Sequence, residues 1–487
     1  MTDPHRASHD LAYLGARDLL RLLDDGVTTS RDVVEGLRAR IAALDSSGDG
    51  ALHSIGALSD DALSVAHTRD EQRARGEIVG PLHGVPVLIK DNIEAVGLPG
   101  LAGSTALVGR PTNDAPLVTN LREAGAIILA STNLSQWANI RSPNSTSGYS
   151  ASGGLVGNPW ALDRSAGGSS SGSGAALAAG LAPLAVGTET DGSITCPASL
   201  NGVVGLKPTV GNVSRIGVVP ISPSQDSPGP MARNVDDLAL LYRVLSSTSP
   251  VGLSSSPRLV EAANWRTGHR GTDAHFDVVM AHLRHSGLVI ATREGALADP
   301  QAYDDELTVM LSELVDAMDA YLAQRPGRGV ATLADVVAFE DEHAQIEQRY
   351  FGHEFFTRAV ASGGCATEVY RRARERNVHW AVARCLAPVL ADDDIVMAPA
   401  YGPAWKSDLV NGDNAKYVSP SIMSAAVAGW PIVTLPMGLV DGLPVGLTLV
   451  GRPHSEWSLL DAARHIEDAL HEFVTVTAPT WRSAVRG

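Results

Sequence analysis

Apolar residues recur at helical spacing near the start of the chain. They do so in residues 16–25 and 30–44, and a more polar helical pattern follows in residues 60–75. Thr29 or Ser30 is a suitable N-cap for the second helix, because a hydroxyl there can accept a hydrogen bond from the first turn. We expect these three helices to cover the core, and we assign them no chemistry.

Short apolar runs farther along the chain predict buried strands that alternate with helices. The predicted strands are residues 82–89, 127–130, 184–188 and 395–400. The predicted helices are residues 119–125, 302–323 and 459–470, with further helices within 333–384. Residues 226–237 are interpreted as a turn that enters a helix, and 246–257, rich in serine and proline, as a surface loop. By itself this alternation indicates an α/β fold and nothing more specific.

Residues 165–198 (SAGGSSSGSGAALAAGLAPLAVGTETDGSITCPA) join a glycine- and serine-rich loop to two regular segments. The loop at 167–174 is unsuited to a regular helix or a central strand, because glycine disfavours both. Residues 175–180 predict a buried helix of small side chains. The strand at 184–188 then leads into the turn 189–193, which would present backbone N–H groups and one hydroxyl at the end of a strand.

Simpler interpretations of this loop explain less of the pattern. A flexible linker would not lead directly into an apolar helix and strand. A phosphate-binding loop would need GxxxxGK[ST] or GxGxxG, and neither is present in this stretch. Residues 168–172 do fit G-x-S-x-G, but the nucleophile elbow needs a strand directly before it, whereas Asn158-Pro159 introduce a loop here.

Lys90 follows directly on the apolar run 82–89, which is an unusual position for a charged residue. A lone lysine in such a place usually extends its amine to the surface. If it is buried instead, loss of hydration lowers the pKa of the amine and lets it act as a base. A serine nucleophile needs such a base, and no histidine lies in these motifs.

Three separated motifs resemble those of the amidase signature family, in the same order along the chain. Residues 165–198 resemble the family pattern of GGSSxG, a small-residue helix and GT[DE]xxGS, and residues 84–91 (GVPVLIKD) resemble G-[IV]-P-x-x-[IV]-K-D. Residues 201–208, 226–237 and 422–450 are similar to the family as well. The sequence TETDGSITCPA, and more loosely YFGHEFF at 350–356, most resembles the peptide amidase branch.

This resemblance implies a serine amide hydrolase that works through an acyl-enzyme. Carried over by motif, Ser193 is the nucleophile, Ser169 lies in a cis peptide and relays a proton, and Lys90 is the base. The implied fold is α/β, with a large, mixed and mostly parallel sheet flanked by helices on both sides. The implied substrate is a carboxamide, either the C-terminal amide of a peptide or a similar small amide.

The same resemblance implies the groups that stabilise the reaction. The backbone N–H groups of Thr190, Asp191, Gly192 and Ser193 would form the oxyanion hole, and Ser170 would support the network by hydrogen bonding. We expect no cofactor and no metal ion.

The chain departs from the family pattern at several positions. Family members commonly carry GKTN and then an acidic residue, whereas this chain has Ser131 in place of the lysine and Gln136 in place of the acid. Asp191 stands where most members have glycine, as it does in the peptide amidase branch. We interpret Lys207 as structural, and we expect Arg233 to be structural too, paired with an acidic residue.

Composition and charge exclude several classes of function. The net charge of −16 argues against nucleic acid as a partner, because phosphate binding needs clustered lysine and arginine. The polar N-terminus and the lack of a long apolar run predict no signal peptide and no membrane span. Cys196, Cys365 and Cys385 lack CxxC spacing, and the H-x-x-H of His282 and His285 has no intervening glutamate, so neither indicates a metal site. We expect a cytoplasmic monomer or homodimer.

We expect residues 1–487 to form one domain. Its parts would be N-terminal helices (1–75), a catalytic core (76–245), a variable helix-rich region on the substrate side (246–390) and C-terminal core strands with a helix (391–487). Two other functions remain open at this point. The chain could be the amidase subunit of a tRNA-dependent amidotransferase, or a binding protein without catalytic activity.

Overall fold

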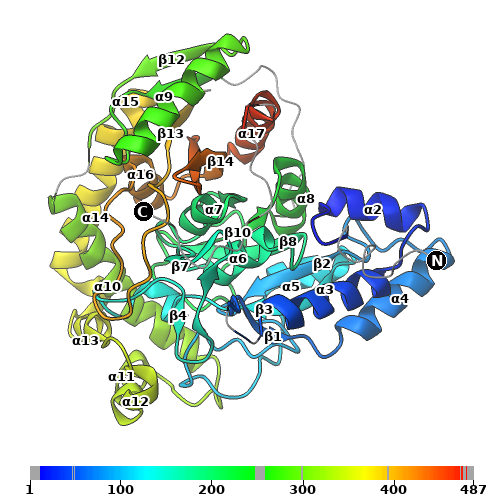
Figure 1. Ribbon diagram of the computed structural model, residues 1–487. Coiled ribbons are helices and arrows are strands. Elements are labelled where there is room, and N and C mark those ends of the chain that lie inside the picture. Colours follow the sequence, from blue (N-terminus) through cyan, green and yellow to red (C-terminus); the bar gives the residue numbers. More distant parts are fainter. Residues whose placement is uncertain are drawn as a thin grey trace.

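A large mixed β-sheet runs through the computed structural model, with helices on both sides of it (Figure 1). The structure describes residues 11–46, 48, 50–246, 258–297, 300–391, 394–471, 473, 474 and 479. Within these residues the sheet has eleven strands in the order β1-β3-β2-β8-β10-β9-β14-β15-β13-β11-β12. The predicted α/β fold is confirmed.

Parallel pairings occur in two groups, β3-β2-β8 and β13-β11-β12. An antiparallel run from β8 through β10, β9, β14 and β15 to β13 joins them, and β1 pairs antiparallel with β3. The strands are β1 Ile55–Leu58, β2 Pro86–Lys90, β3 Ile127–Thr132, β8 Leu184–Glu189, β9 Val204–Lys207, β10 Ser227–Ala232, β11 Arg258–Ala262, β12 Ile290–Arg293, β13 Asp394–Pro399, β14 Ile432–Val440 and β15 Leu443–Val450. Two small hairpins are β4 Tyr149–Ser150 with β5 Gly154–Leu155, and β6 Gly157–Asn158 with β7 Ala161–Ser165.

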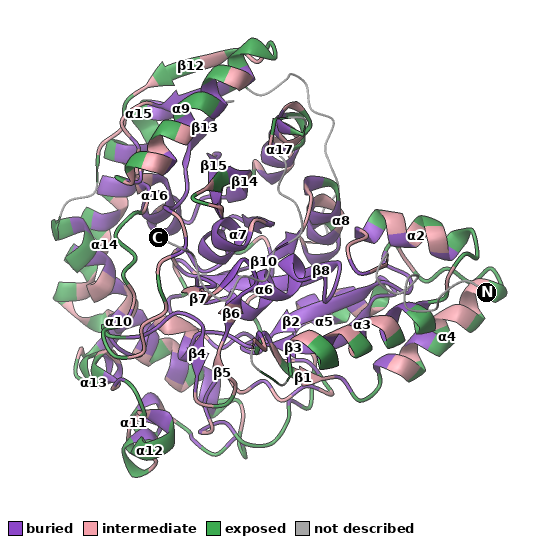
Figure 2. Cartoon of the chain, viewed as in Figure 1, coloured by how far each residue is buried: buried purple, intermediate pink, exposed green. Residues whose placement is uncertain are grey.

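The strands that carry the lysine and serine motifs are buried on both faces. Every residue of β2, β3 and β8 is buried, as expected for parallel strands covered by helices on both sides. Figure 2 shows this buried centre, with exposed residues concentrated on the outer helices. Two short helices pack here, α6 Ser171–Ala178 and α7 Thr195–Asn201, and all their residues are buried too. The small side chains of 165–198 therefore allow close packing at the centre.

The segment at 226–237, predicted as a turn that enters a helix, does lead into a helix, but the part before the helix is a strand rather than a turn. β10 occupies a central place between β8 and β9, although it contains Pro228 and Pro230. Alternate residues of a strand direct their N–H groups to opposite sides. Because both prolines occupy the same alternating set, the N–H groups of Ser227, Gly229 and Met231 stay available on one side. Two prolines are therefore tolerated in this central strand, although prolines in a sequence usually argue against a central strand.

The three N-terminal helices are confirmed. They are α2 Ala16–Asp24, α3 Ser30–Leu44 and α4 Ala62–Ala74. Thr29 is the N-cap of α3, and its hydroxyl accepts a hydrogen bond from the N–H of Asp32 at 3.0 Å. The next helix, α5 Pro116–Glu123, begins earlier than predicted, because proline at the first helical position needs no N–H partner.

Residues 258–390 are rich in helices, as predicted, but they also supply two strands that the sequence pattern did not reveal. β11 and β12 extend the sheet beyond β13. Of the predicted loop at 246–257, only Ser246 lies within the described residues, as the last residue of α8. The helices are α8 Val235–Ser246, α9 Arg270–His285, α10 Pro300–Ala323, α11 Leu333–Glu342, α12 Ala344–Glu347, α13 Glu354–Val360, α14 Glu368–Val378 and α15 Ala387–Val389, with a π-helical segment at His379–Leu386.

The C-terminal part returns to the sheet. α16 Pro420–Ala428 lies between β13 and β14 in the sequence, and α17 Glu456–Leu470 follows β15. The predicted strand at 395–400 is β13, and the predicted helix at 459–470 is the greater part of α17. No helix among the described residues has the length and apolar character needed to cross a membrane.

Two helical glycines should respond in opposite ways to the same substitution. A Cβ atom on Gly172 in α6 would lie 2.2 Å from the carbonyl oxygen of Ser54 and 2.4 Å from that of Asn133, whereas a Cβ on Gly36 in α3 meets no atom within 4 Å. We expect Gly172→Ala to lower the free energy of unfolding by roughly 1–3 kcal/mol through overpacking. Gly36→Ala should raise it by about 0.5–1 kcal/mol through helix propensity.

Urea unfolding of both variants measures these changes. A Gly172→Ala protein as stable as the Gly36→Ala protein would contradict the close approach of α6 to the two carbonyls.

Candidate active site

The sheet brings the lysine and serine motifs to one edge. β2 and β8 are parallel neighbours, with Ile89 opposite Val186, so Lys90 at the end of β2 lies beside the end of β8. The turn that follows β8 carries Ser193, and the loop before α6 carries Ser169. Ligands of α/β proteins commonly bind at the carboxyl ends of parallel strands. At this end Lys90 contacts Ser169, and Ser193 lies in the adjacent turn, where its carbonyl oxygen accepts from the N–H of Ser170.

The amine of Lys90 is fully buried and fully hydrogen-bonded. Its Nζ atom lies at hydrogen-bond distance from the Oγ of Ser169 (2.8 Å), the Oγ1 of Thr188 (2.8 Å) and the carbonyl oxygen of Thr188 (3.2 Å). A neutral amine donates two hydrogen bonds and accepts a third from a hydroxyl. Burial holds the pKa of Lys90 well below its usual value, although the negative charges of Glu189 and Asp226 oppose this shift. A neutral amine at this place can accept the proton of a serine hydroxyl.

Ser169 follows a cis peptide bond with Gly168, as the sequence predicted. Its carbonyl oxygen accepts a hydrogen bond from the N–H of Ser135 at 3.1 Å, which fixes the loop against the segment after β3. A Cβ on Gly168 would lie 2.4 Å from the Oγ of Ser135 and 2.9 Å from the Oγ of Ser147, so only glycine fits before the cis bond. The loop therefore directs the Ser169 hydroxyl toward Lys90.

Ser170 joins the loop to the turn after β8. Its N–H donates to the carbonyl oxygen of Ser193 at 3.0 Å. Its hydroxyl donates to the carbonyl oxygen of Thr188 at 3.0 Å and accepts from the N–H of Thr188 at 3.2 Å. Ser170 thus connects the residue that binds Lys90 with the residue predicted as nucleophile.

The turn 190–193 leaves a row of backbone donors available. Among the described residues, none accepts a hydrogen bond from the N–H groups of Asp191, Gly192 or Ser193. Gly192 has φ +77°, and a Cβ there would lie 2.4 Å from the hydroxyl oxygen of Tyr401. Glycine is therefore required both for the backbone conformation and for the contact with Tyr401.

Two acidic residues hold this turn, and sequence reasoning assigned a role to neither. Glu189 accepts hydrogen bonds from the N–H groups of Ile194 and Thr195 at 2.7 and 2.8 Å, and so caps the start of α7 directly after Ser193. Asp226 accepts from the hydroxyl of Thr190 at 2.6 Å. The position of Glu189 before a short helix was a usable capping signal, whereas the contact of Asp226 spans 36 residues and has no local signature.

Asp191 is paired with an acidic residue of the helix-rich region. Its carboxyl group interacts with that of Glu306 of α10, which is 4% exposed. The Nε2 of Gln225 donates to Glu306 at 2.9 Å and to the carbonyl oxygen of Thr190 at 3.4 Å. Burial raises the pKa of Asp191 to about 7 and that of Glu306 well above its usual range. Two neighbouring buried carboxyl groups repel each other when both are charged, so these raised pKa values favour a state in which the pair holds one proton.

Gln136, at which the chain departs from the family pattern, also contacts a residue of the helix-rich region. The amide nitrogen of Gln136 donates to Glu347 of α12, and its amide oxygen accepts from the N–H of Ala151 at 3.1 Å. Glu347 also accepts from Ser104 at 2.9 Å. An acidic residue at 136 would face the Glu347 carboxylate, so the amide is the side chain that fits.

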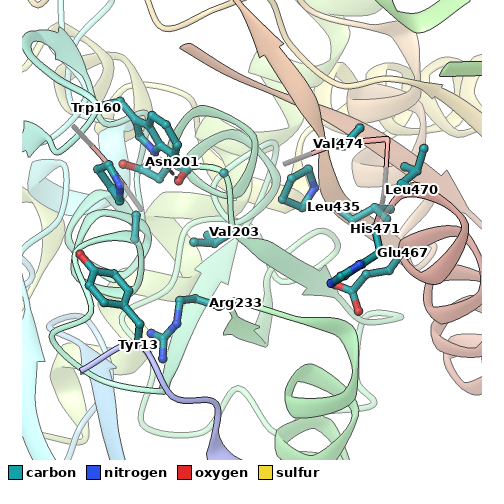
Figure 3. A pocket seen from close by; sticks show the side chains of 14 residues that line it. Tyr13, Trp160, Asn201, Val203, Arg233, Leu435, Glu467, Leu470, His471 and Val474 are labelled. Carbon is teal, nitrogen blue, oxygen red and sulfur yellow. Dashed lines mark hydrogen bonds between the residues drawn. The ribbon is translucent and has the colours of Figure 1, made fainter. Parts of the chain in front are cut away.

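Arg233 lies away from this site, in a cavity of 360 Å³ between α6 and α17 (Figure 3). The figure shows Tyr13 and Arg233 on one side of the cavity, with Glu467 and His471 on the other. Arg233 donates to the carbonyl oxygens of Leu177, Ala182 and Leu14, at 3.1, 2.7 and 2.5 Å. The expectation that it is structural holds, but its hydrogen bonds go to carbonyl groups rather than to an acid.

The chain belongs to the amidase family, because the sequence profile of that family matches residues 32–460. It is an amide-hydrolysing enzyme of the amidase signature type, with the α/β fold of that family. The native peptide amidase of Stenotrophomonas maltophilia is similar over 96% of this chain and 98% of its own, with a TM-score of 0.88 and 37% identity. The peptide amidase PAM in complex with the competitive inhibitor chymostatin gives a TM-score of 0.89 and 38% identity over the same shares. The glutamyl-tRNA(Gln) amidotransferase A subunit of Salinispora arenicola is 33% identical over 95% of this chain and 99% of its own length.

The shared proton of Asp191 and Glu306 should make stability depend on pH. Unfolded carboxyl groups titrate near pH 4, whereas the folded pair keeps a proton to about pH 7 and above. The folded state therefore binds more protons than the unfolded state across this interval, and stability contributed by the pair falls as pH rises. In Glu306→Gln an amide N–H replaces the shared proton. Its free energy of unfolding should therefore decrease less than that of the unmodified chain between pH 5 and pH 8, by roughly 1–3 kcal/mol.

Urea unfolding at the two pH values tests this expectation. Glu375→Gln is the matched control, because Glu375 is an exposed residue of α14 and its replacement should leave the pH dependence unchanged. Equal pH dependence in Glu306→Gln and the unmodified chain would show that the pair does not share a proton.

Proposed function

We propose that the enzyme hydrolyses carboxamides through an acyl-enzyme on Ser193, with Ser169 as proton relay and Lys90 as base. The observation that carries this proposal is the 2.8 Å hydrogen bond between the buried Lys90 amine and the Ser169 hydroxyl, next to the turn that holds Ser193. A buried lysine in its neutral form has the basicity to activate a hydroxyl. Serine hydroxyls are weak nucleophiles without such a base.

The proposed proton transfers follow this geometry. The Ser193 oxygen adds to the amide carbonyl while its proton passes to Ser169, whose own proton passes to Lys90. When the tetrahedral intermediate collapses, the C–N bond breaks and the leaving amine takes up a proton along the reverse path. Water then attacks the ester on Ser193, releasing the carboxylic acid and restoring the serine. Lys90 thus acts first as base and then, protonated, as acid.

The available N–H groups of the turn suit the negative charge that develops on the substrate oxygen. Donors fixed by the fold need no reorganisation during the reaction, and removal of one such donor typically costs about 3–4 kcal/mol in other enzymes. In the proposed oxyanion hole Thr190, Asp191, Gly192 and Ser193 contribute their N–H groups. Glu189 and Asp226 hold the turn from either end, so we propose them as positioning residues.

Peptide C-terminal amides are the proposed substrate class. Support comes from the similarity to peptide amidases over nearly the whole chain, and from TETDGS with Asp191 in the turn. The chain is also 33% identical to an amidotransferase A subunit. This similarity favours a second candidate function, in which the chain would supply ammonia as one subunit of an assembly. The two candidates differ in what the chain does alone: a peptide amidase needs no other subunit.

The isolated chain is therefore expected to release ammonia from a neutral dipeptide amide. Ser193→Ala should reduce this release at least about 10³-fold, because no acyl-enzyme can form. The measurements are ammonia release and the intact mass after treatment with a fluorophosphonate, which should show one adduct on the unmodified chain and none on Ser193→Ala. The control is Ser199→Ala. Ser199 is also a buried serine, but it lies in α7, and this variant should retain the adduct.

Ammonia release from glutamine alone, with none from dipeptide amides, would instead favour the amidotransferase candidate. An adduct that persists in Ser193→Ala would place the nucleophile elsewhere.

Lys90→Met should reduce kcat about 10³-fold or more, since loss of a general base typically costs 10²–10⁴-fold. Lys207→Met is the matched control. Lys207 is also a buried lysine at the end of a strand, but its amine donates to the carbonyl oxygen of Pro208 at 3.1 Å, outside the proposed relay. This variant should keep its turnover within about tenfold.

The value of kcat/KM in the unmodified enzyme should rise with pH as Lys90 loses its proton, at a pH well below the usual lysine pKa. Full activity in folded Lys90→Met, confirmed by circular dichroism, would remove Lys90 from the mechanism.

A further inference from the structure

The chain contains only four lysines, and their distribution is uneven. Lysine and arginine together number 38, so nearly all of the positive charge is arginine. Lys90 and Lys207 are buried at strand ends. The other two, Lys406 and Lys416, are exposed and lie in the loop between β13 and α16. Both exposed lysines line one pocket.

This pocket has a volume of 730 Å³, within the usual size range of small-molecule sites. Its walls combine positive charge with aromatic rings. None of the three proposed catalytic residues lines it. The basic and aromatic side chains of the lining are Arg164, His269, Trp405, Lys406, Lys416 and Tyr417.

The positive charge of the pocket is not neutralised from within. Among the described residues, no carboxylate lies within 4.0 Å of the amine of Lys406 or Lys416. Arg164 is only 3.8 Å from Asp163, a weak ion pair, and donates to the carbonyl oxygen of Ala404 at 3.3 Å. Asp441 is the one acidic residue in the lining. Such a concentration of positive charge is unusual on a chain with a net charge of −16 and favours an anionic ligand.

The aromatic walls are held in place. The rings of His269 and Tyr417 meet edge to face, with their centroids 5.0 Å apart. The indole nitrogen of Trp405 donates to Asp413 at 3.0 Å, and Asp413 accepts from the hydroxyl of Ser147 at 2.6 Å. Fixed aromatic surfaces bind a planar apolar group with little loss of side-chain entropy.

We propose that this pocket binds an organic carboxylate that carries an aromatic ring. The carboxylate would lie between the amines of Lys406 and Lys416, and the ring would contact Trp405 and Tyr417. The inference does not depend on the proposed function, because the pocket contains no catalytic residue. Through Trp405, Asp413 and Ser147 its wall is connected to the loop of Gly168.

The small number of lysines makes a direct test possible. In a chain labelled with ¹³C at lysine Cε, the NMR spectrum has four lysine signals, which can be assigned with Lys→Arg variants. Titration with phenylacetate should shift the signals of Lys406 and Lys416 and leave that of Lys90 in place. Lys406→Met and Lys416→Met should each weaken binding about fivefold, and the double variant should abolish it. Lys→Arg at either position should bind within about threefold of the unmodified chain.

Three comparisons define the ligand and its source. Arg243→Met, which removes an exposed charge of α8, should leave phenylacetate affinity unchanged. Benzyl alcohol and inorganic phosphate should each bind at least about tenfold more weakly, because one lacks the charge and the other the ring. A tripeptide that ends in phenylalanine carries the same two groups, and comparison of its affinity with that of phenylacetate identifies a peptide or a free small molecule as the source. Equal binding of phosphate, a shift of Lys90 alone, or unchanged affinity in the double variant would overturn the proposal.

Discussion

The burial of one lysine amine determines the arrangement of the site. An ammonium ion is strongly hydrated, so removal from water favours the neutral form and holds the pKa of Lys90 well below its usual value. A neutral amine at this depth still needs hydrogen-bond partners, and the Ser169 and Thr188 side chains provide them. The parallel pairing of β2 with β8 supplies Thr188, and the cis peptide loop supplies Ser169. The sheet register and the loop conformation thus together supply the hydrogen-bond partners that this buried amine needs.

Acidic residues lie near the Lys90 amine, but they do not restore its usual pKa. Glu189 and Asp226 use their oxygens to hold backbone N–H groups and the Thr190 hydroxyl, so their hydrogen bonds fix the turn rather than the lysine. Burial raises the pKa values of Asp191 and Glu306, which favours a state with one proton on this pair. The negative charges of Glu189 and Asp226 raise the pKa of Lys90, but burial outweighs them. The site therefore combines a buried amine of lowered pKa with a turn that is held at both ends.

The features that the sequence predicted correctly are those whose causes lie within a few residues. The cap at Thr29 acts locally and could be predicted from the residues alone, whereas the buried lysine and the cis peptide were implied by short motifs that resemble those of the family, and the structure contains all three. A turn was predicted where β10 lies. Its two prolines are tolerated in a central strand only because both lack their N–H group on the same side of that strand. The partners Glu306 and Glu347 were missed, since each contacts the core across a long stretch of sequence, 81 residues to Gln225 and 211 residues to Gln136.

Those missed partners share a physical pattern. The helix-rich region attaches to the core through buried carboxylates that accept hydrogen bonds from core loops. Glu306 accepts from Gln225, Glu313 accepts from Ser222 and the N–H of Ser224, and Glu347 accepts from Gln136, Ser104 and Thr105. A buried carboxylate is costly unless such donors are present, so each contact constrains the core residue opposite it. Two core residues at which the chain departs from the family pattern, Gln136 and Asp191, each interact with one of these carboxylates.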